Sequence, residues 1–237
     1  MDFIENNIYH VYNQGNNQQR IFFNYENQKL FLAKIRKHIL PYADVLAWCL
    51  MSNHFHIMIY VNRIKTEKSA VTNDNIKESA ASNDNLIESA ASNDNIIESA
   101  ASRQTLSKAG NLYTHCSKDH TLNYSIGLML SSYSQTVNKQ QKRSGSLFRN
   151  NTKSECITEC NGISLSFFNV SNGTLINRHL SEKEYPKACF DYIHNNPVKA
   201  GLALKPEDWE FSSFRDVYGL RNGNLINMDR IEQFGLR

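Results

Sequence analysis

"ADVLAWCLMSNHFHIMIYV", residues 43 to 61, is the segment from which the fold can be predicted. It consists of two apolar runs rich in β-forming residues, separated by the polar pair Ser52-Asn53. This pattern predicts two consecutive strands of one sheet, joined by a tight turn. Within the second run, His54 and His56 are one residue apart, so a strand places both imidazoles on the same face, about 7 Å from each other.

The flanking segments extend this pair to a larger pattern. Residues 8–15, "IYHVYNQG", predict an earlier strand that ends in a polar turn containing glycine. Asn24 can cap a helix whose apolar residues recur every four positions from Phe31, and Pro41 cannot continue that helix. After residue 120 a second helical stripe covers residues 121–141, with Leu122, Ile126, Leu130, Tyr133 and Val137.

The order strand, helix, strand, strand, helix predicts an α+β fold. It begins the ferredoxin-like arrangement, an antiparallel sheet with helices on one face. Residues 1–153 form the main domain of this prediction, with an insert over 66–110. Residues 154–184 are predicted to be a hairpin insertion, because Asn172-Gly173 is a turn signal between two β-rich runs that could supply a fourth strand or a separate ribbon. Residues 185–237 are expected to be a helical C-terminal extension, beginning with a short helix that Pro197 ends.

The insert contains a ten-residue repeat over 69–108, with copies such as SAASNDNLIE and SAASNDNIIE. Each copy has too few apolar residues to offset its ordering entropy, which favours a flexible segment, although short helices capped by Ser or Asn are the alternative. The repeat holds 6 acidic and 3 basic residues. The rest of the chain is therefore more basic than the total of +3 indicates.

Composition bounds the class of protein. The chain of 237 residues is long enough for one globular domain with insertions. Its start is acidic where a signal peptide is basic, and no apolar run reaches the roughly 18 residues of a membrane span, so we expect a cytoplasmic protein without a membrane partner. Five cysteines without a CxxC pair favour reduced thiols.

A basic segment follows the second helix. "KQQKRSGSLFRNNTK", residues 139–153, has five cations, one aromatic residue and no carboxylate. Such a run is either a solvated face or a phosphate-binding track with an aromatic ring available for base stacking. The candidate DNA-binding residues are Lys139, Lys142, Arg143, Phe148, Arg149 and Lys153.

The histidine pair also has two interpretations. Two imidazoles on one strand face can close on one metal ion, and an incomplete ligand set leaves positions open for water or a phosphate oxygen. Equally, histidines in strands are often only hydrogen-bonded core residues. Spacing alone does not decide between them.

Several blocks, in order along the chain, resemble one family. They are "YHVYNQGNNQQRIFF", "LAWCLMSNHFHIMI", "SSYSQTVN" with "RSGSLFR", and "YIHNNPVKAGL" with "WEFSSFRDVYG". Together they are similar to the IS200-like, REP-associated tyrosine transposases of the HUH single-strand endonuclease superfamily.

The resemblance implies an enzyme that cuts and rejoins single-stranded DNA near hairpins, as a monomer or homodimer, with Mg²⁺ or Mn²⁺. By position, it gives His54 and His56 as metal ligands, Tyr133 as the nucleophile that forms a 5′-phosphotyrosine, and Asn138, or less well Gln135, as the third ligand. Asn138 lies five residues after Tyr133, about 140° around the helix, whereas the residue four positions on is Val137, which cannot ligate. Two other functions stay open: a domesticated protein that binds hairpin nucleic acid without cutting it, and a metal nuclease that uses water while Tyr133 only packs.

Overall fold

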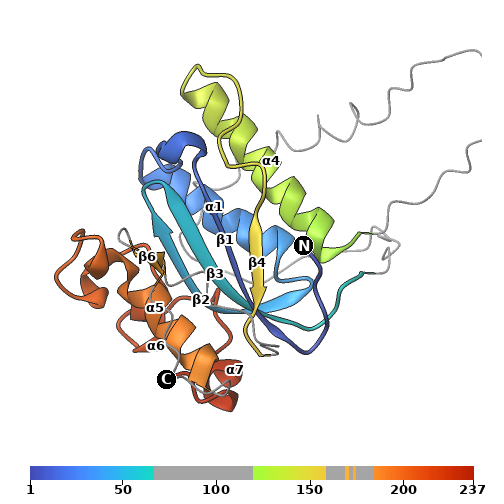
Figure 1. Cartoon of the computed structure of the whole chain (residues 1–237), viewed down its shortest axis with the longest axis vertical. Helices are drawn as coiled ribbons and strands as arrows, with labels where there is room; N and C mark the ends of the chain where they lie inside the picture. Colours follow the sequence, from blue (N-terminus) through green and yellow to red (C-terminus); the bar gives the residue numbers. More distant parts are fainter. Residues whose placement is uncertain (67–119, 159–168, 171–172, 175–183) are drawn as a thin grey trace, which may run out of the picture. The chain divides into compact units, whose positions relative to one another are not determined.

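The elements of the computed structural model follow the predicted order (Figure 1). The structure describes residues 1–66, 120–158, 169–170, 173–174 and 184–237. All the main elements belong to one compact unit, Met1–Glu67 with Asp119–Arg237. The elements are β1 (Ile8–Gln14), η1 (Asn16–Gln18), α1 (Tyr25–His38), β2 (Ala43–Met51), β3 (His54–Val61), α4 (Leu122–Gln140), β4 (Lys153–Cys156), β5 (Asn169–Val170), β6 (Gly173–Thr174), α5 (Tyr185–Lys199), η4 (Pro206–Asp208), α6 (Phe214–Val217) and α7 (Met228–Gln233).

Four strands form one antiparallel sheet in the order β2-β3-β1-β4. With helices between β1 and β2 and between β3 and β4, this is the ferredoxin-like arrangement, and the predicted fold class is confirmed. β3 lies in the interior of the sheet, paired with β1 and β2 on its two sides. The side chains of β3 are therefore held by two neighbouring strands.

The turn between β2 and β3 is the predicted Ser52-Asn53 pair, and it is tied to the segment after β1. The Gly15 amide donates to the Asn53 carbonyl at 2.7 Å, and the Ile21 amide donates to the Ser52 carbonyl at 2.9 Å. These bonds fix the start of β3, where His54 is the first residue.

α1 and α4 pack side by side on one face of the sheet (Figure 1). Both begin at a capping side chain: the Asn27 amide donates to Asn24 Oδ1 at 2.9 Å, and the Tyr124 amide donates to Thr121 Oγ1 at 3.2 Å. Their buried apolar residues form one core cluster with the side chains of β3 that point toward them. This is the helical face that the sequence predicts.

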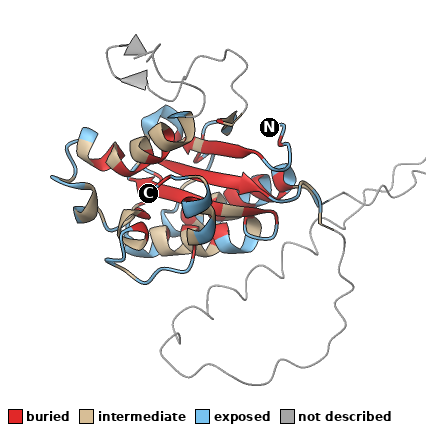
Figure 2. Ribbon diagram, turned by 90° about the horizontal axis from the view of Figure 1, so that it is seen from below, coloured by how far each residue is buried: buried red, intermediate tan, exposed pale blue. Residues whose placement is uncertain are grey.

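The C-terminal extension is helical, as predicted, and it covers the other face of the sheet. Cys189, Phe190 and Ile193 of α5 form a second core cluster with β2 and β3, together with residues of α6 and α7. The sheet therefore lies buried between two layers (Figure 2). α5 continues past Pro197, contrary to the prediction, and ends where Gly201 adopts a φ of +69°.

The fourth strand, β4, comes from the end of the basic segment, and the predicted boundary at residue 153 falls inside it. β5 and β6 pair only with each other among the described strands, so the hairpin over 163–180, as far as it is described, forms a separate ribbon. The rest of that segment and nearly all of the predicted insert over 66–110 lie outside the described residues. Among the described helices, none is both long and apolar enough to cross a membrane.

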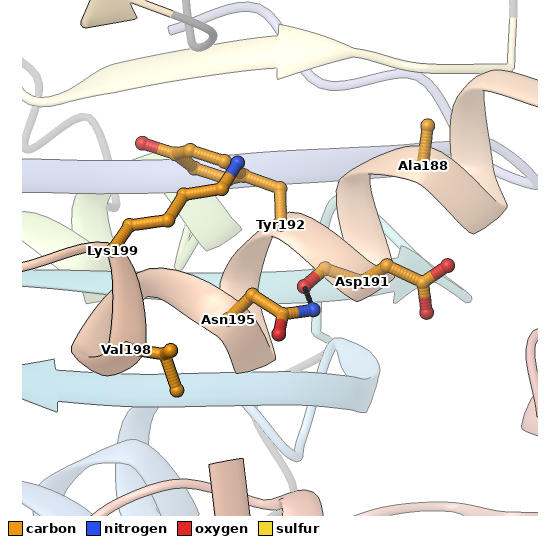
Figure 3. A pocket seen from close by; sticks show the side chains of 6 residues that line it. All are labelled: Ala188, Asp191, Tyr192, Asn195, Val198 and Lys199. Atoms are coloured by element: carbon orange, nitrogen blue, oxygen red, sulfur yellow. Dashed lines mark hydrogen bonds between the residues drawn. The ribbon is translucent and has the colours of Figure 1, made fainter. Parts of the chain in front are cut away.

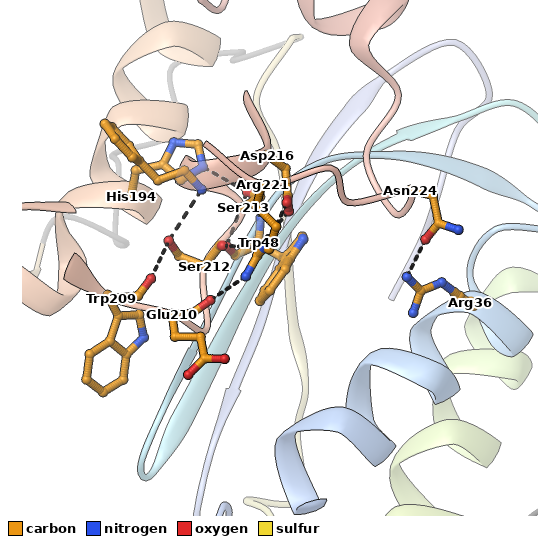
Figure 4. A network of polar contacts seen from close by, with 11 residues as sticks. Arg36, Trp48, His194, Trp209, Glu210, Ser212, Ser213, Asp216, Arg221 and Asn224 are labelled. Atoms are coloured by element: carbon orange, nitrogen blue, oxygen red, sulfur yellow. Dashed lines mark hydrogen bonds and ion pairs between the residues drawn. The ribbon is translucent and has the colours of Figure 1, made fainter. Parts of the chain in front are cut away.

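The outer edge of β2 is closed by the segment that carries the block "WEFSSFRDVYG" (Figure 4). The Trp48 amide donates to Ser213 Oγ, and the Ser213 amide donates to the Trp48 carbonyl, both at 2.9 Å. Arg221 holds this segment through two bonds to Asp216, at 2.6 and 2.7 Å. Covering the edge in this way satisfies backbone groups that would otherwise be open to pairing with another chain.

Candidate active site

The two histidines of β3 face α5, and the residue between them faces α1. The ring centroid of Phe55 lies 4.9 Å from that of Phe31 in α1. His54 and His56 instead hydrogen-bond to Asn196 of α5. The predicted sharing of one strand face by both imidazoles is thus confirmed, and that face belongs to the layer of the C-terminal extension.

The side chain of Asn196 lies between the two imidazoles. His54 Nε2 is 3.2 Å from Asn196 Oδ1, and Asn196 Nδ2 donates to His56 Nε2 at 3.1 Å. The two rings are nearly perpendicular, with centroids 5.1 Å apart. Two ring nitrogens and an amide side chain therefore converge at one point above the sheet.

Each ring nitrogen of His54 faces the side-chain oxygen of an asparagine. His54 Nδ1 lies 2.7 Å from Asn53 Oδ1, and the Asn53 amide is oriented by the bond from its Nδ2 to the Gln18 carbonyl at 3.3 Å. The oxygens of Asn53 and Asn196 can both only accept, so each requires a proton on the His54 nitrogen that faces it. Burial lowers the pKa of His54, and a neutral ring has one proton, so it can donate to only one of these two oxygens.

With the His54 proton on Nδ1, a cation between His54 Nε2 and Asn196 Oδ1 would be bound by the lone pairs of both atoms. Neutral imidazole nitrogens and an amide oxygen are ligands for divalent first-row metals such as Mn²⁺, and three protein ligands leave positions for water and phosphate. The described part of the chain has no group of three or more His, Cys, Asp or Glu side chains that could hold a metal ion. The amide of Asn196 is therefore the candidate third ligand beside His54 and His56, and the donor set fits the cation.

Tyr192 lies one helical turn before Asn196, on the same face of α5. Its ring meets that of His56 edge-on at 5.5 Å and that of His10 at 6.3 Å. Burial raises the pKa of the Tyr192 phenol to about 12. The Lys199 ammonium lies 5.2 Å from the centre of the same ring, beside a shallow hollow of about 220 Å³ along α5 (Figure 3).

A larger cavity of about 470 Å³ opens beside the histidines. Arg149 and Lys153 are its cationic lining residues, and both are exposed. The Tyr12 hydroxyl donates to Glu155 at 2.8 Å on the wall of this cavity. The full lining is Tyr12, Asn13, Gln14, His54, Phe55, His56, Arg149, Asn151, Lys153, Glu155 and Tyr192.

The resemblance gives Tyr133 as the nucleophile, but the structure does not place its phenol beside the histidines. Tyr133 is fully buried on the α1/α4 face, and its hydroxyl donates to the Ile21 carbonyl at 2.8 Å. Its ring centroid lies 5.0 Å from that of Phe31, and burial raises its pKa. The sheet separates this hydroxyl from His54 and His56, so the alternation that turns the histidines toward α5 turns them away from Tyr133.

The predicted third ligands also belong to the α4 layer. Asn138 Nδ2 donates to the Gly145 carbonyl at 2.9 Å, which closes the loop after α4. Gln135 is exposed, and its amide donates to Ser131 Oγ at 3.4 Å. Neither side chain lines the cavity beside the histidines. The structure does not bring them into the candidate site.

The predicted DNA-binding segment divides between two places. Arg149 and Lys153 line the cavity beside the histidines. Lys139 and Lys142 are exposed at and just after the end of α4, and Arg143 donates to Gln19 Oε1 at 2.8 Å.

Phe148 is not available for base stacking, contrary to the prediction. It is buried on the α1/α4 face, where its ring centroid lies 6.0 Å from that of Phe55 and 5.9 Å from that of Tyr133. The aromatic residues on the cavity wall are Tyr12, Phe55 and Tyr192.

Two further histidines lie in the same layer as His54 and His56. His194 is buried and bonded to Ser213 Oγ at 2.8 Å. His10 lies with its Nε2 2.9 Å from His56 Nδ1. Sequence reasoning also missed Tyr192 and Asn196, although their four-residue spacing in "YIHNN" was a usable signal.

Comparison with known proteins adds one similarity. No protein-family model matches the chain, and no curated protein matches it. A solved structure of a REP-associated tyrosine transposase bound to a REP hairpin is similar, with a TM-score of 0.46 and 12% identity over 97% of this chain and 87% of that chain. That similarity is one of fold, and it assigns no reaction and no residue role to this chain.

Proposed function

We propose that this chain is a metal-dependent tyrosine nickase and transposase that cleaves and rejoins single-stranded DNA beside hairpins. The observation that carries the proposal is the convergence of His54, His56 and Asn196, one turn of α5 away from Tyr192. The same constellation of ligands and tyrosine is what the resemblance of the sequence blocks implies. Tyr192 and Asn196 take the roles for which the sequence suggested Tyr133 and Asn138.

The proposed reaction is a transfer of one phosphodiester bond. The Tyr192 oxygen loses its proton and bonds to phosphorus, while the bond from phosphorus to the 3′ oxygen breaks. That oxygen takes up a proton from solvent as it leaves and becomes a 3′-hydroxyl, which balances the proton lost by Tyr192, and the phosphate stays on the 5′ side as a phosphotyrosine. Attack by a 3′-hydroxyl on this link reverses the steps and rejoins DNA without a nucleotide cofactor.

The residues of the site have separate tasks in this reaction. His54, His56 and Asn196 would hold Mg²⁺ or Mn²⁺, which when bound supplies Lewis-acid polarisation of the phosphate oxygens. Arg149 and Lys153 offer positive charge along the cavity for the flanking phosphates.

Activation of Tyr192 is the demanding step, because its phenol has a pKa of about 12 in the metal-free site. A side-chain hydrogen bond with Asn196 lowers the pKa of this phenol, against the larger effect of burial, and so favours the phenolate. The helix also fixes the phenol beside the ligands, so that little orientation entropy is lost in reaching the phosphorus.

The experiment is a covalent-adduct assay. Oligonucleotides with hairpins taken from the DNA that flanks the gene are incubated with the protein and Mg²⁺ or Mn²⁺, and adducts are separated on denaturing gels. Tyr192→Phe should abolish the adduct, while Tyr133→Phe, the same change on the other face of the sheet, should retain it. Asn196→Leu should lose cleavage, and Asn196→Asp, which keeps an oxygen ligand, should retain part of it.

The outcomes distinguish the three functions. An undiminished adduct in Tyr192→Phe would overturn the proposal. Cleavage without an adduct in wild type and in Tyr192→Phe would favour a nuclease that activates water. Hairpin binding without any cleavage would favour the non-cleaving alternative.

A further inference from the structure

His10 is a buried polar residue on the face of β1 that points toward α5. Its side chain has no solvent exposure, and its ring stacks on that of His56, with centroids 5.0 Å apart and planes at 22°. His10 Nε2 lies 2.9 Å from His56 Nδ1. Burying an imidazole here carries a desolvation cost, which an apolar residue at the same position would avoid.

The direction of this hydrogen bond follows from the other nitrogen of His56. Asn196 Nδ2 donates to His56 Nε2, so that nitrogen carries no proton. Burial holds the pKa of His56 well below its usual value, so the ring is neutral and its one proton is on Nδ1. His56 Nδ1 therefore donates to His10 Nε2, which accepts.

Two tyrosine rings pack against His10. The ring of Tyr12 stacks on it with centroids 4.7 Å apart, and the Tyr12 hydroxyl is fixed by Glu155 at 2.8 Å. The ring of Tyr192 approaches its edge at 6.3 Å. Burial lowers the pKa of His10 to about 3, so the ring is a neutral acceptor throughout the physiological range.

We infer that His10 is a positioning residue for the metal site, accepting the Nδ1 proton of His56 and so directing the His56 Nε2 lone pair at the ion. This inference rests on the proposed function, because it concerns the same ion. His10 is not a ligand itself, since its Nε2 meets His56 on the side of the ring away from Asn196. A hydrogen-bonded partner of this kind fixes both the tautomer and the orientation of a ligating histidine.

The test measures Mn²⁺ affinity of the full chain by isothermal titration calorimetry or by electron paramagnetic resonance, without DNA. His10→Leu removes the acceptor and should weaken Mn²⁺ binding about 10- to 100-fold. His10→Gln, whose amide oxygen can accept from His56, should recover most of that loss. His194→Gln, a change of another buried histidine in the same layer, is the matched control and should leave the affinity within about twofold.

A second measurement needs no variant. Long-range ¹H–¹⁵N spectra of the metal-free wild type should show His56 protonated on Nδ1 and unprotonated on Nε2. The opposite tautomer would overturn the inference, even if His10→Leu failed to fold. Unchanged Mn²⁺ affinity in a folded His10→Leu protein would also overturn it.

These failures differ from failure of the proposed function. If His56→Ala loses Mn²⁺ binding and His10→Leu keeps it, the metal site stands and the role of His10 falls. If wild type and His56→Ala both bind no Mn²⁺, the metal site falls, and the role of His10 falls with it.

Discussion

Replacing Tyr133 with phenylalanine separates the two tyrosines by stability as well as by activity. The substitution removes one oxygen from a fully buried side chain and breaks its 2.8 Å bond to the Ile21 carbonyl. The ring itself stays, so its contacts with Phe31 and Phe148, at centroid distances of 5.0 and 5.9 Å, are retained. The loss is therefore that of a hydrogen bond, without a large cavity.

The magnitude follows from the state of the carbonyl that is left behind. A buried acceptor without its donor costs about 1 to 3 kcal/mol. For a chain of this size that free energy corresponds to a fall in Tm of about 2 to 12 °C. Tyr124→Phe, on the same helix at a side chain 38% exposed, should change the free energy of unfolding by no more than about 0.5 kcal/mol.

The assay combines urea unfolding, followed by circular dichroism, with the covalent-adduct assay at a temperature well below both transitions. We expect Tyr133→Phe to be less stable and to form the adduct at the wild-type level. Loss of the adduct with unchanged stability would refute the reasoning, because it would make Tyr133 a reacting group with no structural hydrogen bond to lose.

Two further predictions concern charge. Arg149→Gln and Lys153→Gln should each weaken binding of a hairpin oligonucleotide and reduce the slope of log K against log salt concentration by about 0.7, as measured by fluorescence anisotropy; an unchanged slope would place the DNA elsewhere. Burial lowers the pKa of His194 to about 3, so below pH 6.5 the unfolded chain binds a proton that the folded chain does not. His194 should therefore reduce the free energy of unfolding as the pH falls from 6.5 toward 3, by up to about 1.4 kcal/mol per pH unit. His194→Gln should flatten this slope in urea titrations with EDTA, and an identical slope would contradict the prediction.

The sequence predicted the main elements of the fold because each has a strong local signal. The two-residue break at Ser52-Asn53 and the cap at Asn24 mark places where backbone groups need particular partners. β4 has no such signal, since "KSEC" is short, lies at an edge and lacks regular alternation. Its pairing with β1 depends on tertiary contacts that local sequence does not encode.

The partner of the histidines was harder to predict, because both faces of the sheet are buried. Alternation places His54 and His56 together but does not say which helix they meet. Because β3 has apolar residues on both faces, its sequence does not show which face packs against which helix. α5, which covers the histidine face, comes only after residues 157–184. The order of the sequence blocks therefore led to Tyr133, in α4, which is the next helix after β3 along the chain.

Topology alone would have shown that the histidines do not face α4. The connections from β1 to β2 and from β3 to β4 each join parallel strands through a helix, and right-handed crossovers place both helices on the same face. α1 presents an apolar stripe to the sheet, so the face it shares with α4 takes Phe55, and the histidines must turn to the other layer. The proposed function needs a tyrosine and a polar ligand on one helix face of that layer, and residues four apart on a helix are neighbours. Tyr133 is followed at that spacing by Val137, whereas Tyr192 is followed by Asn196, which lies between the two imidazoles.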